Sequence, residues 1–319
     1  MPPTYPLLTV TPNPSLDLLF EHDRLVWDDA NRMADARRRP GGQGINVARA
    51  ARELGGQALA LSLLGGRTGR DIAEILDREG TRYRAVFGPN ETRTFVAVRE
   101  RATGRSLLLN ARGPAQGDRE ADALEQLVVE ALAQERPAWL AACGSLPAGF
   151  PPDFYARIGA HARQAGARFV PDCDGEPLLL AWRAGCDLLV PNQHEAGRLL
   201  GRDLGDGDVA AAAQAARALR AAGASMVAIT LGPAGAVLAC DDGCWHARHP
   251  PLDAGSAVGA GDVFLAALLL ALQSETPAPD ALARAVAAAT ATLLARGSAL
   301  VGRGDVDRIR PRVVVAELS

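Results

Sequence analysis

The sequence contains no lysine: its 34 basic residues are all arginine, and with 37 acidic residues they leave a net charge of −3. This balance gives no positive field suited to a nucleic-acid backbone, so we do not expect nucleic acid as a partner. Apolar runs of the length that a membrane span requires are also missing, as is the basic-then-apolar pattern of a signal peptide. We therefore expect a cytoplasmic protein that does not bind membranes.

Cysteine is scarce as well, with five residues at positions 143, 173, 186, 240 and 244 and no paired CxxC spacing. This pattern predicts reduced thiols in the core rather than a zinc site or a disulfide framework. The 319 residues, 48% of them hydrophobic, suffice for one large α/β domain or for two small domains that share a core.

Short apolar runs alternate with helical patterns from Glu120 onward. Such alternation predicts a parallel sheet covered by helices on both faces, with ligands at the C-terminal ends of its strands. Two β-rich pieces, roughly 12–36 and 90–112, fall outside the alternation and predict a small β lid on a single domain that spans 1–319. Residues 28–39 are polar and rich in arginine, and we expect them to form an exposed lobe.

A glycine-rich segment at 257–264, AVGAGDVF, precedes an apolar helical pattern and carries the strongest site signal. Backbone N–H groups at a helix N-terminus, unobstructed by side chains at Gly259 and Gly261, form a pocket for a developing anion. Asp262 is then a candidate catalytic base. Taken alone, the pattern is explained equally well by a charge that only stabilises the helix.

A second glycine loop, GGQGIN at 41–46, also precedes a helical pattern. It weakly mimics a dinucleotide-binding fingerprint, but the residues before it are rich in arginine and do not resemble a buried strand. The remaining alternatives are a loop that lets the backbone approach a polar ligand and a purely structural turn.

Two further segments follow predicted strands. Asn192 and Glu195 stand three residues apart where a helix begins, which suits oxygen ligands of a hydrated Mg²⁺ and suits a helix capping pair equally well. The turn at 230–236 contains Gly232 and Gly235, so its backbone can lie against a ligand.

Six motifs occur in an order and spacing that resembles the phosphofructokinase-B branch of the ribokinase family, across nearly the whole chain. They are NPSLD at 13–17, GGQGIN at 41–46, GSLP at 144–147, PNQHE at 191–195, TLG at 230–232 and GAGD at 259–262. The opening TPNPSLD is most similar to phosphofructokinases and tagatose-6-phosphate kinases. The resemblance implies an α/β, ribokinase-like fold: a central, mostly parallel sheet flanked by helices, with a small β lid.

The resemblance also implies ATP-dependent transfer of phosphate to a hydroxyl of a hexose phosphate: fructose 6-phosphate, fructose 1-phosphate or tagatose 6-phosphate. Asp262 would take the proton from the hydroxyl, above an anion hole formed by Gly259, Ala260 and Gly261. The residues implied to face the sugar are Asp17, Gly42, Asn46 and Ser145. Those implied at the ATP site are Asn192, Thr230, Gly232 and Gly235, with Asn192 and Glu195 holding Mg²⁺ through water or phosphate.

A phosphorylated substrate requires positive charge near the lid, and Arg32 and Arg93 stand at the family positions suited to supply it. For each, the alternative is an arginine on the solvated surface. Family members often pair through their lids, whose strands have exposed edges, so we expect a homodimer.

Three departures from the family pattern leave the substrate and the affinity for ATP open. Val190 replaces a lysine that relatives often carry, Gln43 replaces a glycine or lysine, and Ala257 replaces a common threonine. The alternatives are therefore a kinase of an unphosphorylated sugar or nucleoside, a sugar-phosphate-binding regulator without catalysis, and a nicotinamide-dependent oxidoreductase.

Overall fold

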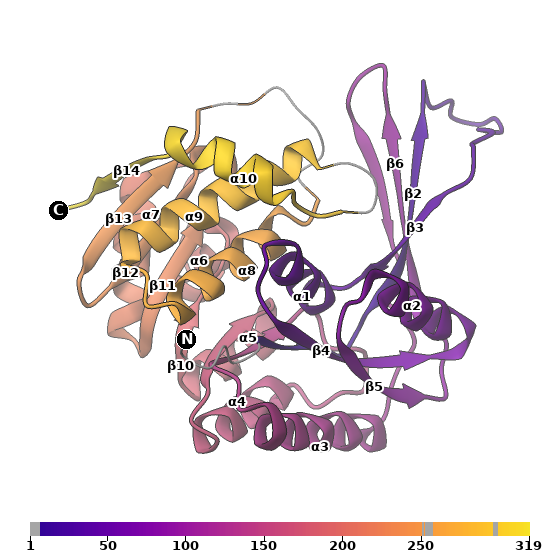
Figure 1. Cartoon of the computed structure of the whole chain (residues 1–319), viewed down its shortest axis with the longest axis horizontal. Coiled ribbons are helices and arrows are strands. Elements are labelled where there is room, and N and C mark those ends of the chain that lie inside the picture. The colour runs from indigo at the N-terminus through magenta and orange to yellow at the C-terminus, as the bar shows by residue number, and fades with distance from the viewer. Residues whose placement is uncertain (1–6, 251, 253–257, 296–298) are drawn as a thin grey trace.

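Five parallel strands form the first sheet of the protein (Figure 1). The computed structural model describes residues 7–250, 252, 258–295 and 299–319. The sheet has the order β5-β4-β1-β8-β9, with bounds β1 Leu7–Thr11, β4 Ala58–Gly65, β5 Tyr83–Gly88, β8 Trp139–Cys143 and β9 Arg168–Asp172. Because both faces are covered, β1, β4 and β8 are buried along their whole length, as expected for a parallel sheet.

A second five-stranded sheet continues the layer, since β10 lies beside β9. Its order is β10-β11-β12-β13-β14, with bounds β10 Cys186–Leu189, β11 Ala224–Thr230, β12 Ala236–Cys240, β13 Gly243–Arg248 and β14 Val314–Glu317. The first two strands are parallel, and the remaining pairs are antiparallel. The C-terminal ends of β9, β10 and β11 therefore meet at one edge.

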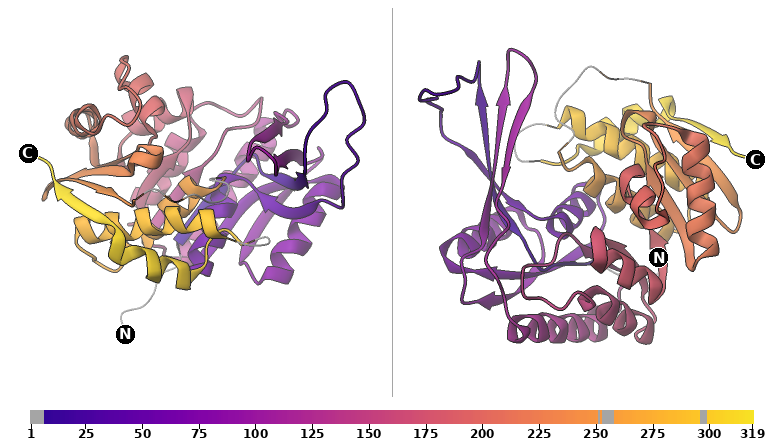
Figure 2. Two further views of the ribbon diagram at one scale, coloured as in Figure 1. Left: turned by 90° about the horizontal axis from the view of Figure 1, so that it is seen from above. Right: turned by 180° about the vertical axis from the view of Figure 1, so that it is seen from behind.

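Helices cover both faces of this layer (Figure 2). One core cluster joins the sheet to α1 Gln43–Glu53, α2 Gly66–Glu79, α8 Ala260–Gln273, α9 Ala278–Ala291 and α10 Arg303–Ile309. The other joins it to α3 Asp118–Glu135, α4 Phe154–Gln164, α5 Gly175–Arg183, α6 Gln193–Leu200 and α7 Val209–Ala221. Adjacent strand residues alternate between the clusters: Leu7 belongs to the first, Leu8 to the second.

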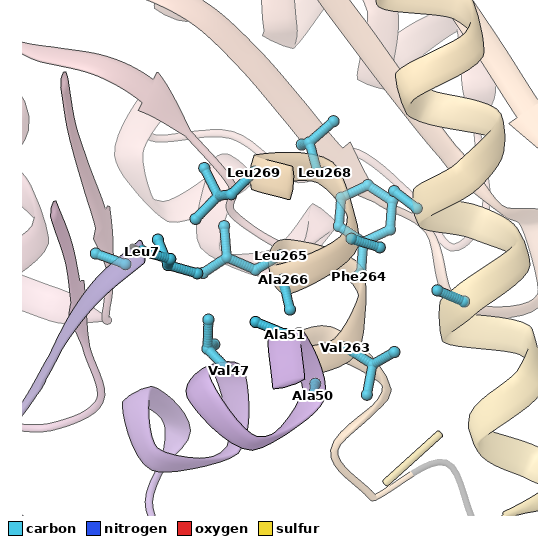
Figure 3. Packing of buried hydrophobic residues seen from close by; sticks show 14 of the residues in the cluster. Leu7, Val47, Ala50, Ala51, Val263, Phe264, Leu265, Ala266, Leu268 and Leu269 are labelled. Atoms are coloured by element: carbon cyan, nitrogen blue, oxygen red, sulfur yellow. The ribbon is translucent and has the colours of Figure 1, made fainter. Parts of the chain in front are cut away.

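Helix α8 is buried on nearly all sides, as its almost uniformly apolar sequence predicts. Val47 and Ala51 of α1 face Leu265 and Ala266 of α8 (Figure 3). This packing fixes the start of α8, where Asp262 lies, relative to α1.

Four strands form a small sheet that projects beyond the helices (Figure 1). Its order is β3-β2-β6-β7, with bounds β2 Ser15–His22, β3 Arg37–Gly41, β6 Arg93–Glu100 and β7 Ser106–Asn110. The expectation that 28–39 form an exposed lobe is wrong for Arg39, which is buried, whereas Arg37 and Arg38 are exposed although β3 begins at Arg37. Because three consecutive arginines show no alternation of apolar and polar residues, the sequence does not indicate this strand.

Several elements give little signal in the sequence: β5, α5, β13, α10 and β14 were not predicted. Helix α10 is only 7 residues long and β14 only 4, too short for a periodic pattern. The five cysteines are buried and free, which confirms the prediction of reduced core thiols. Among the described residues, no helix is both long and apolar enough to cross a membrane.

The α1–α8 contact predicts a large difference between two valine truncations. Val47→Ala removes two methyl groups from a side chain that is 0% exposed, and should lower the free energy of unfolding by about 1.5–3 kcal/mol. Val314→Ala removes the same atoms from a side chain that is 56% exposed and should change it by less than about 0.5 kcal/mol. Guanidinium unfolding curves measure both, and equal losses would contradict the packing described.

Candidate active site

The N-terminus of α8 presents open backbone. Gly259 is the N-cap, with φ of 88° in the left-handed region that favours glycine. Among the described residues, a Cβ at Gly261 would meet nothing within 4 Å. The first N–H groups of a helix have no partner within the helix, and here no side chain at 259 or 261 covers them.

Asp262 lies in the first turn of α8, 7% exposed, and its Oδ2 accepts a hydrogen bond of 2.8 Å from Asn46 Nδ2. Burial raises the pKa of Asp262 from its ordinary 3.8 to about 7, while the hydrogen bond from Asn46 and the charge of Arg39 oppose the rise. A carboxylate that titrates near neutral pH is suited to accept a proton as a general base.

A second buried carboxylate, Asp17, lies on β2 of the small sheet. Its Oδ1 accepts a hydrogen bond of 2.7 Å from Ser15 Oγ, and its Oδ2 accepts one of 3.3 Å from Arg39 Nε. Burial raises its pKa, and the negative charge of Asp17 in turn raises that of Asp262. The side chain reaches this position because residue 41 is glycine: a Cβ there would stand 2.0 Å from Asp17 Oδ1.

Arg93 lies beside Asp17 but donates mainly to the backbone. Its Nε and Nη2 donate to Asn13 O at 3.3 and 3.1 Å, and its Nη1 donates to Ala111 O at 3.0 Å and to Asn110 Oδ1. Burial lowers its pKa, and the charge of Asp17 opposes this. These four hydrogen bonds use most of the five N–H donors of the guanidinium, so little donor capacity remains for a ligand.

The remaining residues predicted to face the sugar lie around this group, with one exception. Asn13 Nδ2 donates to Ser145 Oγ at 3.1 Å. Gly42 is the N-cap of α1, and a Cβ there would stand 2.7 Å from Thr11 Cγ2 at the end of β1. Arg32 is exposed in the connection between β2 and β3, and no contact among the described residues joins it to Asp17, Arg93 or Asp262.

The residues predicted to meet the nucleotide gather at the ends of β10 and β11, where Asn192 and Thr230 form an isolated parallel bridge. Asn192 and Glu195 make a capping box: Asn192 Oδ1 accepts from the Glu195 N–H, and Glu195 Oε2 accepts from the Asn192 N–H, both at 2.9 Å. The capping alternative is therefore correct, which leaves a metal role untested.

The structure also describes the turn after β11 and two of the three residues that depart from the family pattern, Val190 and Gln43. Gly232 and Gly235 have φ of 57° and 92°, and a Cβ at Gly235 would stand 2.0 Å from Ala247 O. Val190 is buried in the core, while Gln43 begins α1 with its Oε1 close to Gly144. Ala257 lies outside the described residues.

Asp172, at the end of β9, was missed by the sequence analysis. Its pKa is raised well above the ordinary value by burial and by the charges of Asp262 and Glu195. An acidic residue directly after the predicted strand 168–171 was the available signal. Over the part of the chain that is described, no three His, Cys, Asp or Glu side chains form a group that could hold a metal ion.

A buried carboxyl beside the N–H groups of a helix start, at an edge where three strand ends meet, suits a phosphotransferase of the α/β class. The chain matches the pfkB family carbohydrate kinase model over residues 13–301, and it belongs to that family.

Individual relatives are similar over almost their whole length. The chain is 36% identical to a 1-phosphofructokinase of Xanthomonas campestris over 96% of this chain and 94% of that protein. It is 32% identical to the ATP-dependent 6-phosphofructokinase isozyme 2 of Escherichia coli, over 95% and 97%. The structure of Escherichia coli phosphofructokinase-2 in complex with fructose-6-phosphate superimposes with a TM-score of 0.88 at 31% identity, covering 96% and 98%. The expected family and ribokinase-like fold are thus confirmed.

The raised pKa of Asp262 predicts that the site lowers the stability of the folded protein. Between about pH 4 and pH 7 the folded state binds a proton that the unfolded chain releases, so this carboxyl makes stability fall as pH rises through that window. Asp262→Asn removes the ionisable group and should raise the melting temperature at pH 8, with the gain disappearing near pH 4. Calorimetry at both pH values measures this.

Asp280→Asn is the matched control, because Asp280 is also an acidic residue in the first turn of a helix but is exposed and paired with Arg310. It should give no gain at pH 8. An equal gain from both variants would mean that the burial of Asp262 has no electrostatic cost.

Proposed function

We propose that this protein transfers the γ-phosphoryl group of ATP to a hydroxyl of a fructose phosphate. The observation that carries the proposal is Asp262, whose pKa of about 7 and position at the uncovered start of α8 suit a base in phosphoryl transfer. The hexose-phosphate acceptor is supported by the 1- and 6-phosphofructokinase relatives. Tagatose 6-phosphate is a third acceptor of the same chemistry.

The proposed transfer is a direct displacement at phosphorus. The sugar hydroxyl gives its proton to an Asp262 carboxylate oxygen while its own oxygen bonds to the γ-phosphorus, and the bond from phosphorus to the ADP oxygen breaks. N–H groups at Gly259, Ala260 and Gly261 would stabilise the charge on the transferred group. Asn46 orients Asp262 through the 2.8 Å hydrogen bond. Most of the acceleration would come from alignment and from these fixed donors.

The sugar would lie between Asp262 and the small sheet. Asp17, Gly42, Asn46 and Ser145 would orient its hydroxyl groups, with the buried Asp17 carboxyl as the strongest acceptor. Arg93 would act on the substrate phosphate chiefly through its charge, since four of its hydrogen bonds are to protein atoms. Arg32 would reach the phosphate only by a movement of its loop.

ATP would bind along the ends of β10 and β11, against Asn192, Thr230, Gly232 and Gly235. The residues nearby fit Mg²⁺: Glu195 supplies oxygen, and because burial raises the pKa of Glu195 and of Asp172, a cation beside them would stabilise their ionised forms. Asn192 and Glu195 would hold the ion through water or phosphate, and Mg²⁺ would neutralise charge on the phosphates when bound.

We further propose that the small sheet acts as a lid and joins two copies of the chain. Its outer strand β7 exposes Leu108 and Leu109, and the connection after β2 exposes Val26 and Trp27, the latter at 76%. A second copy of the same sheet would cover these apolar groups and the free edge of β7. Five free thiols are consistent with a reducing compartment, for which we propose the cytoplasm.

The kinase proposal predicts a specific loss of turnover. In a coupled assay of ADP formation, wild type should phosphorylate at least one of fructose 6-phosphate, fructose 1-phosphate and tagatose 6-phosphate, and EDTA should stop the reaction. Asp262→Asn should lower kcat by roughly 10²- to 10⁴-fold, because the base is lost while the site keeps its shape. The wild-type kcat/KM should fall as pH drops below about 7, where Asp262 becomes protonated.

Asp280→Asn again serves as the matched control and should leave kcat unchanged. Turnover of unphosphorylated sugars or nucleosides alone would replace the proposed acceptor. If the protein binds sugar phosphate but Asp262→Asn leaves every measurable turnover as in wild type, the protein is a binding regulator and not this kinase.

The pairing of the small sheets predicts an effect on mass. Leu109→Asp places a charge on the exposed apolar strand and should shift the wild-type dimer towards monomer in light scattering coupled to size exclusion. Asp242→Asn, an exposed change far along the chain on the β12–β13 turn, should leave the mass as in wild type. A Leu109→Asp protein with unchanged mass would show that another surface forms the oligomer.

A further inference from the structure

The arginine run at 37–39 has three different environments. Arg37 pairs with Glu21 at 2.8 Å and Arg38 pairs with Asp71, and both arginines are exposed. Arg39 is 6% exposed and pairs with Asp17 at 3.3 Å. Since side chains alternate along a strand, Arg37 and Arg39 share the inner face of the small sheet, and Arg38 lies on the other.

The buried Arg39–Asp17 pair is poorly explained as a stabilising contact. Removing two charges from water costs several kcal/mol per ion, and a pair of apolar side chains in their place is often as stable or more so. Asp17 has a second donor in Ser15, at 2.7 Å. A fully charged guanidinium at this place therefore calls for a role beyond folding.

The donors of Arg39 are largely uncommitted. Within the described residues its one recorded hydrogen bond is from Nε to Asp17, and the two terminal amino groups carry four more N–H bonds. Arg39 lines a cavity of about 450 Å³ together with Val258 and Leu300. Leu300 Cδ2 lies 3.2 Å from where a Cβ on Gly259 would stand, so this cavity borders the start of α8.

The charged groups that face Asp262 come from several elements. Arg39 of β3 favours its ionised form, and so does the hydrogen bond from Asn46 of α1. Asp17 of β2 opposes it, whereas the charge of Asp262 raises the pKa of Asp172 of β9, and Cys143 of β8 lies near without a charge of its own at neutral pH. Among the described residues, Arg39 is the cation whose charge lowers the pKa of Asp262.

We propose that Arg39 is a positioning residue of this kinase, which holds Asp17 against the sugar and supplies the positive charge that keeps the base Asp262 ionised beside the carboxyl group of Asp17. The inference rests on the proposed function and deepens it. In a chain without lysine, this buried arginine supplies the fixed cation at the reacting end of the site.

The test compares Arg39→Gln, Arg39→Lys and Arg38→Gln with wild type. For the best sugar-phosphate acceptor, kcat/KM is measured from pH 5.5 to pH 9, together with KM for ATP and the melting temperature. Arg39→Gln should move the acid limb of the profile upward by about one pH unit, because the favourable charge is lost while the opposing Asp17 remains. That shift lowers kcat/KM about tenfold on the acid side of the limb, with KM for ATP near that of wild type.

Arg39→Lys keeps the charge and should hold the acid limb near its wild-type position, even with a raised KM for the sugar. Arg38→Gln, on the opposite face of the same strand, should superimpose on wild type. If Arg39→Gln fails to fold, Arg39→Lys still tests the proposal, because a shift of the acid limb of its pH profile would contradict it.

Two results would overturn the inference. If the acid limb of the Arg39→Gln profile stays at its wild-type pH, Arg39 does not act on the base. A uniform loss at every pH, with a lowered melting temperature and no rescue by lysine, means a structural role only. Absence of wild-type turnover on every sugar phosphate is a separate result, which removes the proposed function itself and this inference with it.

Discussion

The hydrogen bond between Asn46 and Asp262 is the interaction on which the site depends. It joins α1 to α8 across 216 positions of sequence, and each helix begins at a glycine with positive φ, Gly42 or Gly259. The two helices are locked by the apolar contact of Val47 with Leu265. The distance between the Asp262 carboxyl and the glycine loop before α1 is therefore set by core packing and does not depend on the conformation of a flexible loop.

Burial makes this carboxyl useful and also costly. An aspartate in water is a weak base near neutral pH, whereas burial raises the pKa of Asp262 to about 7. The negative charge of Asp17 raises the pKa of Asp262 further.

Much of the architecture could be predicted from the sequence because long periodic segments dominate it. The glycine segment before α8 and the alternation after Glu120 identify the helix start and the parallel strands. Strand β3 could not be identified in this way, because an arginine can be buried or exposed and the run at 37–39 carries no periodic signal. Its burial is decided by Asp17, which is distant in the sequence.

The site could be predicted less completely, for a similar reason. The spacing of Asn192 and Glu195 fits both a cap and a metal role, and only coordinates show the capping hydrogen bonds. An arginine at 93 suggests phosphate binding, yet the direction of its guanidinium towards Asn13 and Ala111 depends on the loop after β7. Asp172 becomes notable only when β9 is seen to end beside Asp262 and Glu195.

The small sheet and the helical body each contribute one half of the reacting end. Asp17 and Arg39 belong to β2 and β3, whereas Asp262 belongs to α8. Any displacement of these strands relative to α8 alters the electric field at the base as well as the shape of the space around it. In the proposed mechanism, enclosure of a ligand and readiness for proton transfer are therefore mechanically coupled.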